Sequence, residues 1–466
     1  MKYLKMLFLI LCMLFIQECI FADDALNPYQ IIIKLKNLPE NSALAAIQPY
    51  LSDLEATINL KINEVKPMAG GAYIIAFTPE QIQQLAKKEN VANDTAFNHL
   101  VKLLSNRNNV IYAVKDRIIK LDPKEIVAVK EPINVSASDQ WDQKKAPDKP
   151  TKDNTPWGVN LAAAWQTSKG SNTIVVAVLD TGLADNVDLP KTDPNKIAPG
   201  YNFYDNNTDI TDYGNNTSYH GTHVAGIIGA TGTIFGMAPN IKILPILVLK
   251  PSSRESSVIN GIYWAVNKQP PENIPTNPNP AKVLNLSLGG TSACDAAYQQ
   301  AIDAAVATGT PGAPSATVVV AAGNENLDAS TSSPANCNNV ITVAATNLKG
   351  VRAPYSNYGS TVTIAAPGGV TEITDAWTGI LSTVKNGYRY HQGTSQAAPH
   401  VAGIAALLYS IKPDATPTQI KSWLTSSVHS FSSDPSLTEF NCTGKKTCGA
   451  GIVDAGAAVA KAKASL

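Results

Sequence analysis

The 466-residue sequence lacks features that would assign it to several common classes of protein. Its 37 basic and 37 acidic side chains give a formal net charge of zero, and it has no run of five or six like charges. Nucleic acids and anionic lipids are bound by such runs, so we expect no nucleic acid partner. The apolar stretch near the N-terminus falls short of the roughly 20 residues that a membrane-spanning helix needs.

The N-terminal stretch has the features of a secretory signal. Two lysines precede about ten apolar residues, which end in Ile-Phe-Ala before two aspartates. We expect cleavage after Ala22, so that residues 1–22 are removed and the rest is secreted, with retention in a periplasm as the alternative. An uncleaved anchor is disfavoured by the short apolar run. A lipid anchor on Cys19 is disfavoured because Glu18 precedes it where a small residue is needed.

Cysteine is scarce, and its spacing does not suggest a metal site. Of the six cysteines, Cys12 and Cys19 lie in the signal segment, and no CxxC or HxxxH spacing typical of zinc proteins is present. An even number of cysteines in an exported chain favours disulfides over a metal site. Three pairings are possible, and we prefer the one that closes the short loop NCTGKKTC. It pairs Cys442 with Cys448 and Cys294 with Cys337.

Two units joined by a polar segment are predicted. Apolar periodicity in residues 23–121 indicates a small α+β domain with strands at 29–36, 70–77 and 109–121 and helices at 40–54 and 97–104. Residues 122–156 are rich in Lys, Asp and Pro, which favours an exposed connector that is open to cleavage and contains the start of the mature chain.

The second unit, residues 157–466, has the pattern of an α/β domain. Apolar β-branched runs at 172–180, 241–249, 282–288, 316–323 and 339–345 alternate with helical segments. Such runs predict an open parallel sheet with helices on both faces. The chemistry of such domains lies at the carboxyl ends of the strands.

Four polar residues lie at expected strand or helix ends, and each one alone has an ordinary structural explanation. Asp180 and Asn324 follow apolar strands, where turn residues are common. Ser395 begins an apolar helix, where serine is a frequent cap. His220 also begins an apolar helix; with His223 it could bind a metal, but the third ligand of a zinc site is missing. The alternative is that His220 is a base and His223 a hydrogen-bonded core residue.

Taken together, the four positions resemble a known family. The motifs DTG at 180–182, HGTHVAG at 220–226, AAGN at 321–324 and GTSQAAPHVAG at 393–403 are similar, in order and rough spacing, to those of the subtilisin-like serine proteases. The resemblance covers about residues 157–460. It implies a secreted serine endopeptidase, with a peptide-binding protein of the same fold that does not cut as the alternative.

The resemblance also implies roles for individual residues. Ser395 would be the nucleophile, His220 the general base, Asp180 the group that orients the imidazole, and Asn324 an oxyanion-hole donor. The implied substrate cleft has two walls: Ser287, Leu288 and Gly289 on one side, and Ala321, Ala322 and Gly323 on the other. Residues 328–336 would lie near the floor of the primary pocket. Since no charged residue clearly marks that pocket, we expect a loose preference for apolar or medium-sized side chains before the cut.

Partners and ions follow from the same resemblance. Residues 29–121 look like an inhibitor-like propeptide, so the partners would be protein or peptide substrates and the chain's own propeptide, with the enzyme a monomer. Catalysis would need no cofactor. A structural calcium ion is possible, and the loop 204–216 supplies oxygen donors of the kind that calcium prefers, from Asp205, Asp209 and Asp212.

Two positions depart from the pattern of the family. Gln396 stands where many members have methionine, so oxidation there is not a route to inactivation. The segment KPSSRES at 250–256 replaces a glycine-rich turn beside the cleft. Pro251 cannot donate a hydrogen bond to a paired peptide, which puts the substrate preference in doubt.

Overall fold

The computed structural model describes residues 26–38, 44–120, 135–147, 156–214, 218–270, 274–308, 315–371, 376–432, 440–442 and 444–466. The expected signal segment, residues 1–22, lies outside these ranges, as does much of the expected connector. Within the described ranges, no helix is long and apolar enough to cross a membrane.

Residues 26–120, here called the first unit, form the expected α+β domain. Its four-stranded antiparallel sheet has the order β2-β3-β1-β4. Its elements are β1 (Gln30–Leu35), α2 (Leu44–Ile58), β2 (Glu64–Met68), β3 (Ala72–Ala76), α3 (Pro79–Glu89), α4 (Asn93–Ser105) and β4 (Val110–Lys115).

Two elements of the first unit were not predicted from the sequence. Strand β2, EVKPM, has too few apolar residues to stand out. Helix α3 begins at a capping box: Thr78 accepts a hydrogen bond from the Gln81 backbone, and the Gln81 side chain accepts one from the Thr78 backbone. The spacing T-x-x-Q with proline at the first helical position is a helix-start signal that could have found it.

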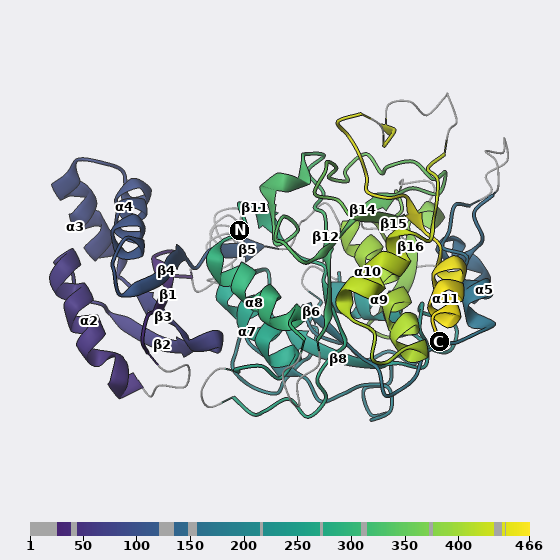
Figure 1. Ribbon diagram of the computed structural model, residues 1–466, viewed down its shortest axis with the longest axis horizontal. Helices are drawn as coiled ribbons and strands as arrows, with labels where there is room; N and C mark the ends of the chain where they lie inside the picture. The colour runs from purple at the N-terminus through teal and green to yellow at the C-terminus, as the bar shows by residue number, and fades with distance from the viewer. Residues whose placement is uncertain are drawn as a thin grey trace, which may run out of the picture.

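Strand β1 is buried on both faces of its sheet. Ile31 and Ile33 pack in the first unit's own core, which α2 and α4 complete. Ile32 points the other way, into a core that it shares with Val258 and Ile262 of α7 (Glu255–Ala265). Figure 1 shows the first unit, in purple and blue, lying beside α7 and α8 (Ala296–Val306). The second contact explains why β1 is a continuous apolar run rather than an alternating one.

Residues 157–466 contain the predicted parallel sheet. It has nine strands in the order β18-β19-β15-β14-β12-β10-β6-β8-β7. All neighbouring pairs are parallel except β18 with β19. The strands are β6 (Val175–Asp180), β7 (Tyr201–Asn202), β8 (Lys242–Leu247), β10 (Val283–Leu286), β12 (Thr317–Ala321), β14 (Ile341–Thr346), β15 (Ile364–Pro367), β18 (Val428–His429) and β19 (Ile452–Val453).

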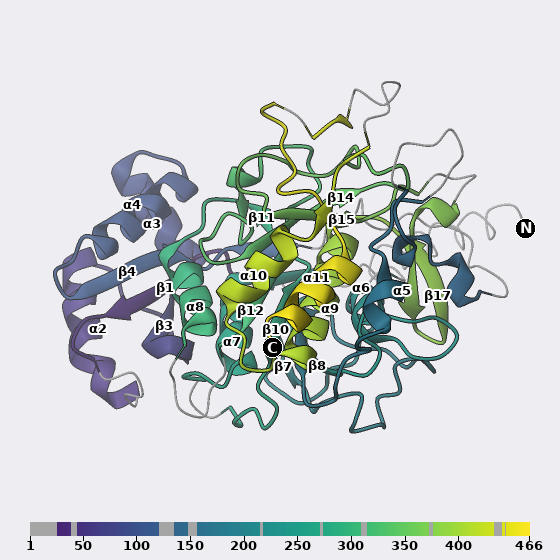
Figure 2. The same cartoon turned by 45° about the vertical axis from the view of Figure 1, so that its right-hand side comes forward.

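Helices cover both faces of this sheet, as expected. Along β6, Val176 and Val178 join the core beneath α6 and α9, whereas Ala177 and Leu179 join the core beneath α7 and α8. Figure 2 shows α9, α10 and α11 side by side on one of these faces. The helices are α5 (Leu161–Trp165), α6 (His220–Gly229), α7 (Glu255–Ala265), α8 (Ala296–Val306), α9 (Thr394–Ile411), α10 (Pro417–Thr425) and α11 (Ala455–Ala464).

Three short antiparallel pairs lie outside the main sheet. Strand β11 (Gly290–Thr291) pairs with β13 (Ser332–Ser333), and β16 (Ile380–Val384) pairs with β17 (Gly387–His391). The third pair joins the two units, because β5 (Ile118–Lys120) lies antiparallel to β9 (Ser252–Arg254). The segment that contains Pro251 is therefore followed directly by an edge strand that already has a partner.

The expectation of an exposed connector holds for residues 136–139, 144 and 145 but is wrong for Gln140, Trp141 and Asp142. Gln140, Trp141 and Asp142 are each at most 3% exposed. Trp141 packs with Ile227 of α6 and Ile380 of β16 in a small apolar cluster. The polar composition of the segment predicted exposure, but a few buried side chains are enough to hold a polar segment on a protein surface.

Candidate active site

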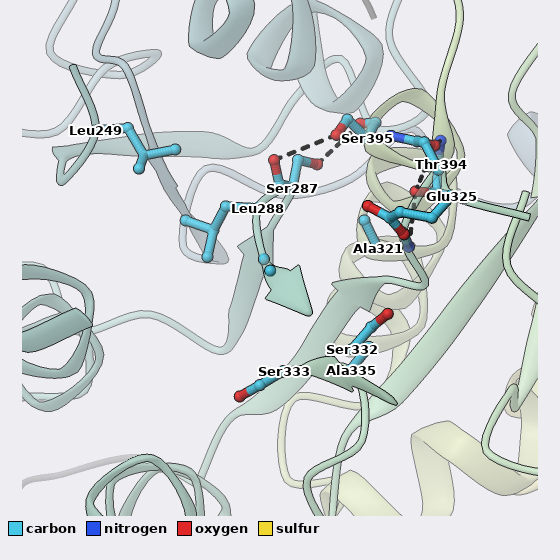
Figure 3. A pocket seen from close by; sticks show the side chains of 14 residues that line it. Leu249, Ser287, Leu288, Ala321, Glu325, Ser332, Ser333, Ala335, Thr394 and Ser395 are labelled. Atoms are coloured by element: carbon cyan, nitrogen blue, oxygen red, sulfur yellow. Dashed lines mark hydrogen bonds between the residues drawn. The ribbon is translucent and has the colours of Figure 1, made fainter. Parts of the chain in front are cut away.

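The four candidate residues meet at one edge of the main sheet. Asp180 is the last residue of β6, Ser287 directly follows β10, and Asn324 lies three residues beyond β12. These three strands are parallel neighbours, so their carboxyl ends lie together. Helix α9 begins at Thr394, and its second residue, Ser395, approaches this edge, where Figure 3 shows it beside Ser287.

Asp180 and His220 form a buried pair. Asp180 Oδ1 lies 2.7 Å from His220 Nδ1, and the two side chains are 0% and 2% exposed. The same carboxylate oxygen accepts a hydrogen bond from the Thr181 backbone N–H, and the Thr181 hydroxyl accepts one from the Gly221 backbone. The end of β6 is thus joined to the start of α6. Because Nδ1 donates its proton to Asp180, the neutral ring presents Nε2 as a proton acceptor.

The backbone of Ser395 is held from outside its own helix. Pro399 has no N–H, so it cannot donate to the Ser395 carbonyl four residues earlier. The Ser287 hydroxyl takes that place and donates to this carbonyl at 2.8 Å. The Ser395 hydroxyl in turn lies 3.3 Å from the Ser287 carbonyl, and both contacts are drawn in Figure 3. Ser395 is 3% exposed.

The amide of Asn324 is oriented by Thr394. Its Oδ1 accepts hydrogen bonds from the Thr394 backbone N–H at 2.8 Å and from the Thr394 hydroxyl at 3.0 Å. The Thr394 hydroxyl also accepts a bond from Gly323 N–H. With its carbonyl end held in this way, Asn324 lines the cavity, and the Nδ2 donor is the other end of its amide.

A cavity begins at these residues, and five of the six expected cleft residues line it. Ala322 is the exception: it is fully buried and packs with Trp157 and Ala344 behind the cavity wall. The expected floor contributes Ser332, Ser333 and Ala335, which Figure 3 shows. The lining residues are Leu249, Ser287, Leu288, Gly289, Gly290, Ala321, Gly323, Asn324, Glu325, Ser332, Ser333, Ala335, Thr394 and Ser395.

Glu325 contradicts the expectation that no charged residue marks the pocket. It directly follows Asn324 and lines the cavity. Its carboxylate accepts a 2.7 Å hydrogen bond from Asn357 Nδ2, while Asn357 Oδ1 accepts one from the Glu325 backbone. The residue itself is exposed. Its place in the sequence beside Asn324 was the signal that could have found it.

His223 is a core residue, as the second alternative predicted. Its Nε2 donates to the Arg389 carbonyl at 3.0 Å, and its ring stacks on His391 with centroids 3.9 Å apart. Burial lowers the pKa of His223 to about 3, and burial also lowers the pKa of His391. Both rings are therefore neutral near pH 7.

The three aspartates expected as calcium ligands do not form a ligand set. Asp205 pairs with Lys250 at 2.7 Å, and Asp209 accepts from Tyr213 at the surface. Asp212 turns inward and accepts from the Thr222 hydroxyl at 2.8 Å. Across the part of the chain that the structure describes, no group of three or more His, Cys, Asp or Glu side chains could hold a metal ion.

Both expected disulfides are present. Cys294 is bonded to Cys337 and Cys442 to Cys448. The first one secures the cavity floor, because Cys337 follows the lining residue Ala335 by two positions. The Asn336 side chain also donates to the Ser292 carbonyl across the same gap.

Comparison with known proteins gives the family. A model of the subtilase family matches residues 171–451. This chain belongs to the subtilase family. Among curated relatives, an extracellular protease of Xanthomonas campestris is 38% identical over 343 residues, covering 66% of this chain and 54% of the relative. An extracellular basic protease of Dichelobacter nodosus is 36% identical, covering 65% and 53%. The chain spans about half the length of these relatives.

Solved structures of subtilases agree with the fold. A protease from Pseudoalteromonas arctica aligns with a TM-score of 0.60 and 40% identity, over 70% of this chain and 97% of that one. The epidermin leader peptide processing serine protease of Staphylococcus aureus aligns with a TM-score of 0.63, over 93% of this chain and 98% of that one. At 21% identity, the second likeness concerns the fold alone.

Asp212 gives a prediction about stability and pH. Its pKa is raised to about 6, chiefly by burial and also by the charge of Asp180, although hydrogen bonds from Thr222 and Gly214 oppose the rise. The native carboxyl group thus holds its proton more tightly than an unfolded one, so its contribution to stability is lost as pH rises from about 4 to about 6. In Asp212→Asn, the decline in the free energy of unfolding over this range should be smaller by up to ~3 kcal/mol. Denaturant unfolding in a Ser395→Ala background, where self-digestion cannot interfere, measures this.

Asp209 in the same loop provides the control with opposite sign. Hydrogen bonds from Thr211 and Tyr213 lower the pKa of Asp209, so its contribution is present above about pH 4 and is lost on acidification. Asp209→Asn should therefore leave the decline between pH 4 and 6 in place. An Asp212→Asn variant whose stability follows pH as the parent does would contradict the assignment.

Proposed function

We propose that this subtilase is a secreted serine endopeptidase made as a zymogen. The observation that carries the proposal is the buried Asp180–His220 pair, at 2.7 Å, on the sheet edge where α9 presents Ser395. Relatives named extracellular proteases support secretion and peptide-bond hydrolysis. The enzyme acts as a monomer on protein or peptide substrates.

The residues suffice for acyl transfer. The Ser395 hydroxyl attacks the substrate carbonyl while His220 takes its proton, and Asp180 stabilises the imidazolium that forms. His220 then gives the proton to the leaving amine, which leaves an ester between Ser395 and the acyl half of the substrate. Water, deprotonated by His220, attacks this ester, and His220 returns the proton to the Ser395 oxygen as the acid product leaves. The first N–H groups of α9 and Asn324 Nδ2 stabilise the negative charge on the tetrahedral oxygen, and no cofactor enters these steps.

Residues 23–121 act as an inhibitory propeptide in this proposal. An extended substrate would add as a strand along Ser287–Gly289 and, on the other side of the cleft, along the edge that β9 offers. Strand β5, at the end of the first unit, already pairs with that edge through Ile119 and Ser253. The first unit therefore blocks part of the substrate site for as long as it stays bound.

The cut that releases the first unit falls within residues 121–134. Strand β5 ends at Lys120, where it is still paired with β9 of the catalytic domain. The segment that begins at residue 135 also packs on that domain. The boundaries are then a signal at 1–22, a propeptide that extends to the cut, and a catalytic domain that includes residues 135–147 with 157–466.

The decisive test compares the wild type with Ser395→Ala by intact mass after purification of the folded protein. We expect the wild type to appear as two fragments cut within residues 121–134 and the variant to stay whole, because only Ser395 can start the cleavage. If both stay whole although folded, self-processing is excluded. That result would favour activation by another protease, or a peptide-binding protein that does not cut.

Glu325 should favour cationic side chains immediately before the scissile bond. A carboxylate at the cavity attracts Lys and repels Glu, by roughly 0.5–1 kcal/mol each in a solvated site. In Glu325→Gln, the ratio of kcat/KM for a Lys substrate to that for a matched Glu substrate should fall about tenfold. A matched Leu substrate is the control and should change little. The fall in the Lys-to-Glu ratio should be smaller at high salt, which screens the carboxylate. If the ratio is the same in Glu325→Gln as in wild type, Glu325 does not determine specificity.

The interface between the two units gives a prediction about pH. It buries three carboxylates (Asp116, Glu255 and Asp295) beside two guanidinium groups, Arg117 and Arg254. Burial raises the pKa of Glu255 to about 8 and also raises that of Asp116. The bound state thus holds protons more tightly than the separated units, so binding weakens as pH rises to about 8, above which Glu255 is ionised in both states. The inhibition constant of added residues 26–120 should rise from pH 6 to about 8 and then level off.

Two variants separate this effect from other titrations. Glu255→Gln removes the surplus carboxylate and should flatten the dependence of the inhibition constant on pH. Glu80→Gln is the matched control at an exposed position of α3, where the pKa of the carboxyl group is lowered, and it should keep the wild-type slope. Equal slopes in wild type and Glu255→Gln would contradict the interface as the source.

A further inference from the structure

The segment 135–147 is fixed to the catalytic domain by specific hydrogen bonds. The Gln140 side-chain amide both donates to and accepts from the backbone of Phe235, at 2.7 and 2.9 Å. Trp141 Nε1 donates to the Gly379 carbonyl at 2.7 Å, just before β16. Further along, the Asp142 carbonyl accepts from the Val159 backbone. The segment is therefore held on both sides of Asp142.

The side chain of Asp142 reaches the helix that carries Ser395. Asp142 Oδ2 lies 3.0 Å from His400 Nε2, and both residues are at most 2% exposed. His400 Nδ1 lies 2.8 Å from the Gln396 carbonyl. A carbonyl oxygen can only accept, so Nδ1 donates, and a proton must also lie between Nε2 and the carboxylate. His400 thus joins Asp142 to the residue directly after Ser395.

This contact acts on the first turn of α9, which depends on outside support. Pro399 cannot donate to the Ser395 carbonyl four residues earlier, and the Ser287 hydroxyl donates to it. The next carbonyl, that of Gln396, receives the His400 ring. The two carbonyls that follow the Ser395 hydroxyl along the chain are therefore both bonded by side chains, one from the cleft wall and one backed by Asp142.

We propose that Asp142 and His400 are positioning residues that fix the first turn of α9, and with it Ser395, in the reactive geometry. The segment 135–147 is then part of the support of the active site rather than a spacer left by processing. This inference rests on the proposed serine endopeptidase function. A displacement of about 1 Å at a nucleophile can cost on the order of a hundredfold in rate, so a buried tether at this point has a large effect on catalysis.

The experiment measures kcat and KM per active site for the processed wild type and for Asp142→Asn, His400→Gln and the double variant. Active sites are counted by titration with a serine-directed phosphonate. We expect kcat to fall at least tenfold in each single variant, with KM within twofold of wild type, since the substrate-binding strands are untouched. The fall in kcat in the double variant should be no larger than the fall in the more affected single variant, because the two residues act through one contact. Asp139→Asn, at an exposed position three residues away in the same segment, is the matched control and should be unchanged.

Each outcome assigns a cause. If Asp142→Asn and His400→Gln melt at lower temperature but keep the wild-type kcat per titrated site, the pair is only a structural anchor and the inference is overturned. If a single variant does not fold because a charged partner is left buried, the double variant, which leaves no unpaired charge, replaces it. A wild-type kcat in the folded double variant also overturns the inference. If the wild type itself is not labelled by the phosphonate, the proposed function fails instead.

Discussion

The candidate site depends on bringing two buried side chains from separate elements into contact without backbone clashes. Asp180 ends β6, His220 begins α6, and the 2.7 Å contact between them requires the two backbones to lie unusually close. A Cβ at Gly221 would stand 2.5 Å from the Gly182 carbonyl oxygen, and one at Gly182 would stand 2.4 Å from the Ile210 carbonyl. Gly182 also has a φ of +105°, which L-side chains rarely adopt. The glycines of DTG and HGT are thus geometric requirements of the acid–histidine pair.

The Ser395 end of the candidate site is built differently, from a helix start whose carbonyl groups are bonded by side chains. Pro399, in the second turn of α9, has no N–H to donate to the Ser395 carbonyl, and the Ser287 hydroxyl donates to this carbonyl. The helix is fastened to its surroundings by Ser287, which donates to the Ser395 carbonyl, and by Asp142, which contacts His400. Asn324 is joined to the same turn through Thr394. The ends of β10 and β12 therefore fix the position of the helix start through Ser287 and Asn324.

Sequence reasoning found what local patterns determine and missed what depends on packing. Continuous apolar runs such as TIVVAVLD gave the parallel sheet, and the motifs around Asp180, His220, Asn324 and Ser395 gave the site, because each motif keeps its chemistry within a few residues. Ala322 and Glu325 could not be assigned in the same way, since alternate residues beyond a strand end face opposite sides. The polar segment 135–147 resembled a linker until its contacts were visible: Asp142 meets His400 across 258 positions of sequence. Likewise, three aspartates in one loop suggested calcium, but their side chains diverge to Lys250, Tyr213 and Thr222.

Because both faces of β1 are buried, the proposed roles of the first unit in folding and in inhibition would depend on the same contacts. A parallel sheet of nine strands needs many long-range contacts before it gains stability, and such sheets fold slowly. The first unit offers α7 a ready apolar surface through Ile32, and its own core does not cover that surface. Strand β5 of the same unit also pairs with β9. In the proposed zymogen, release of the first unit by cleavage would expose Ile32 as an apolar face on a small domain, so the released unit would be less stable than the bound one. In the proposed protease, the contact that helps folding thus also makes the freed first unit the better substrate.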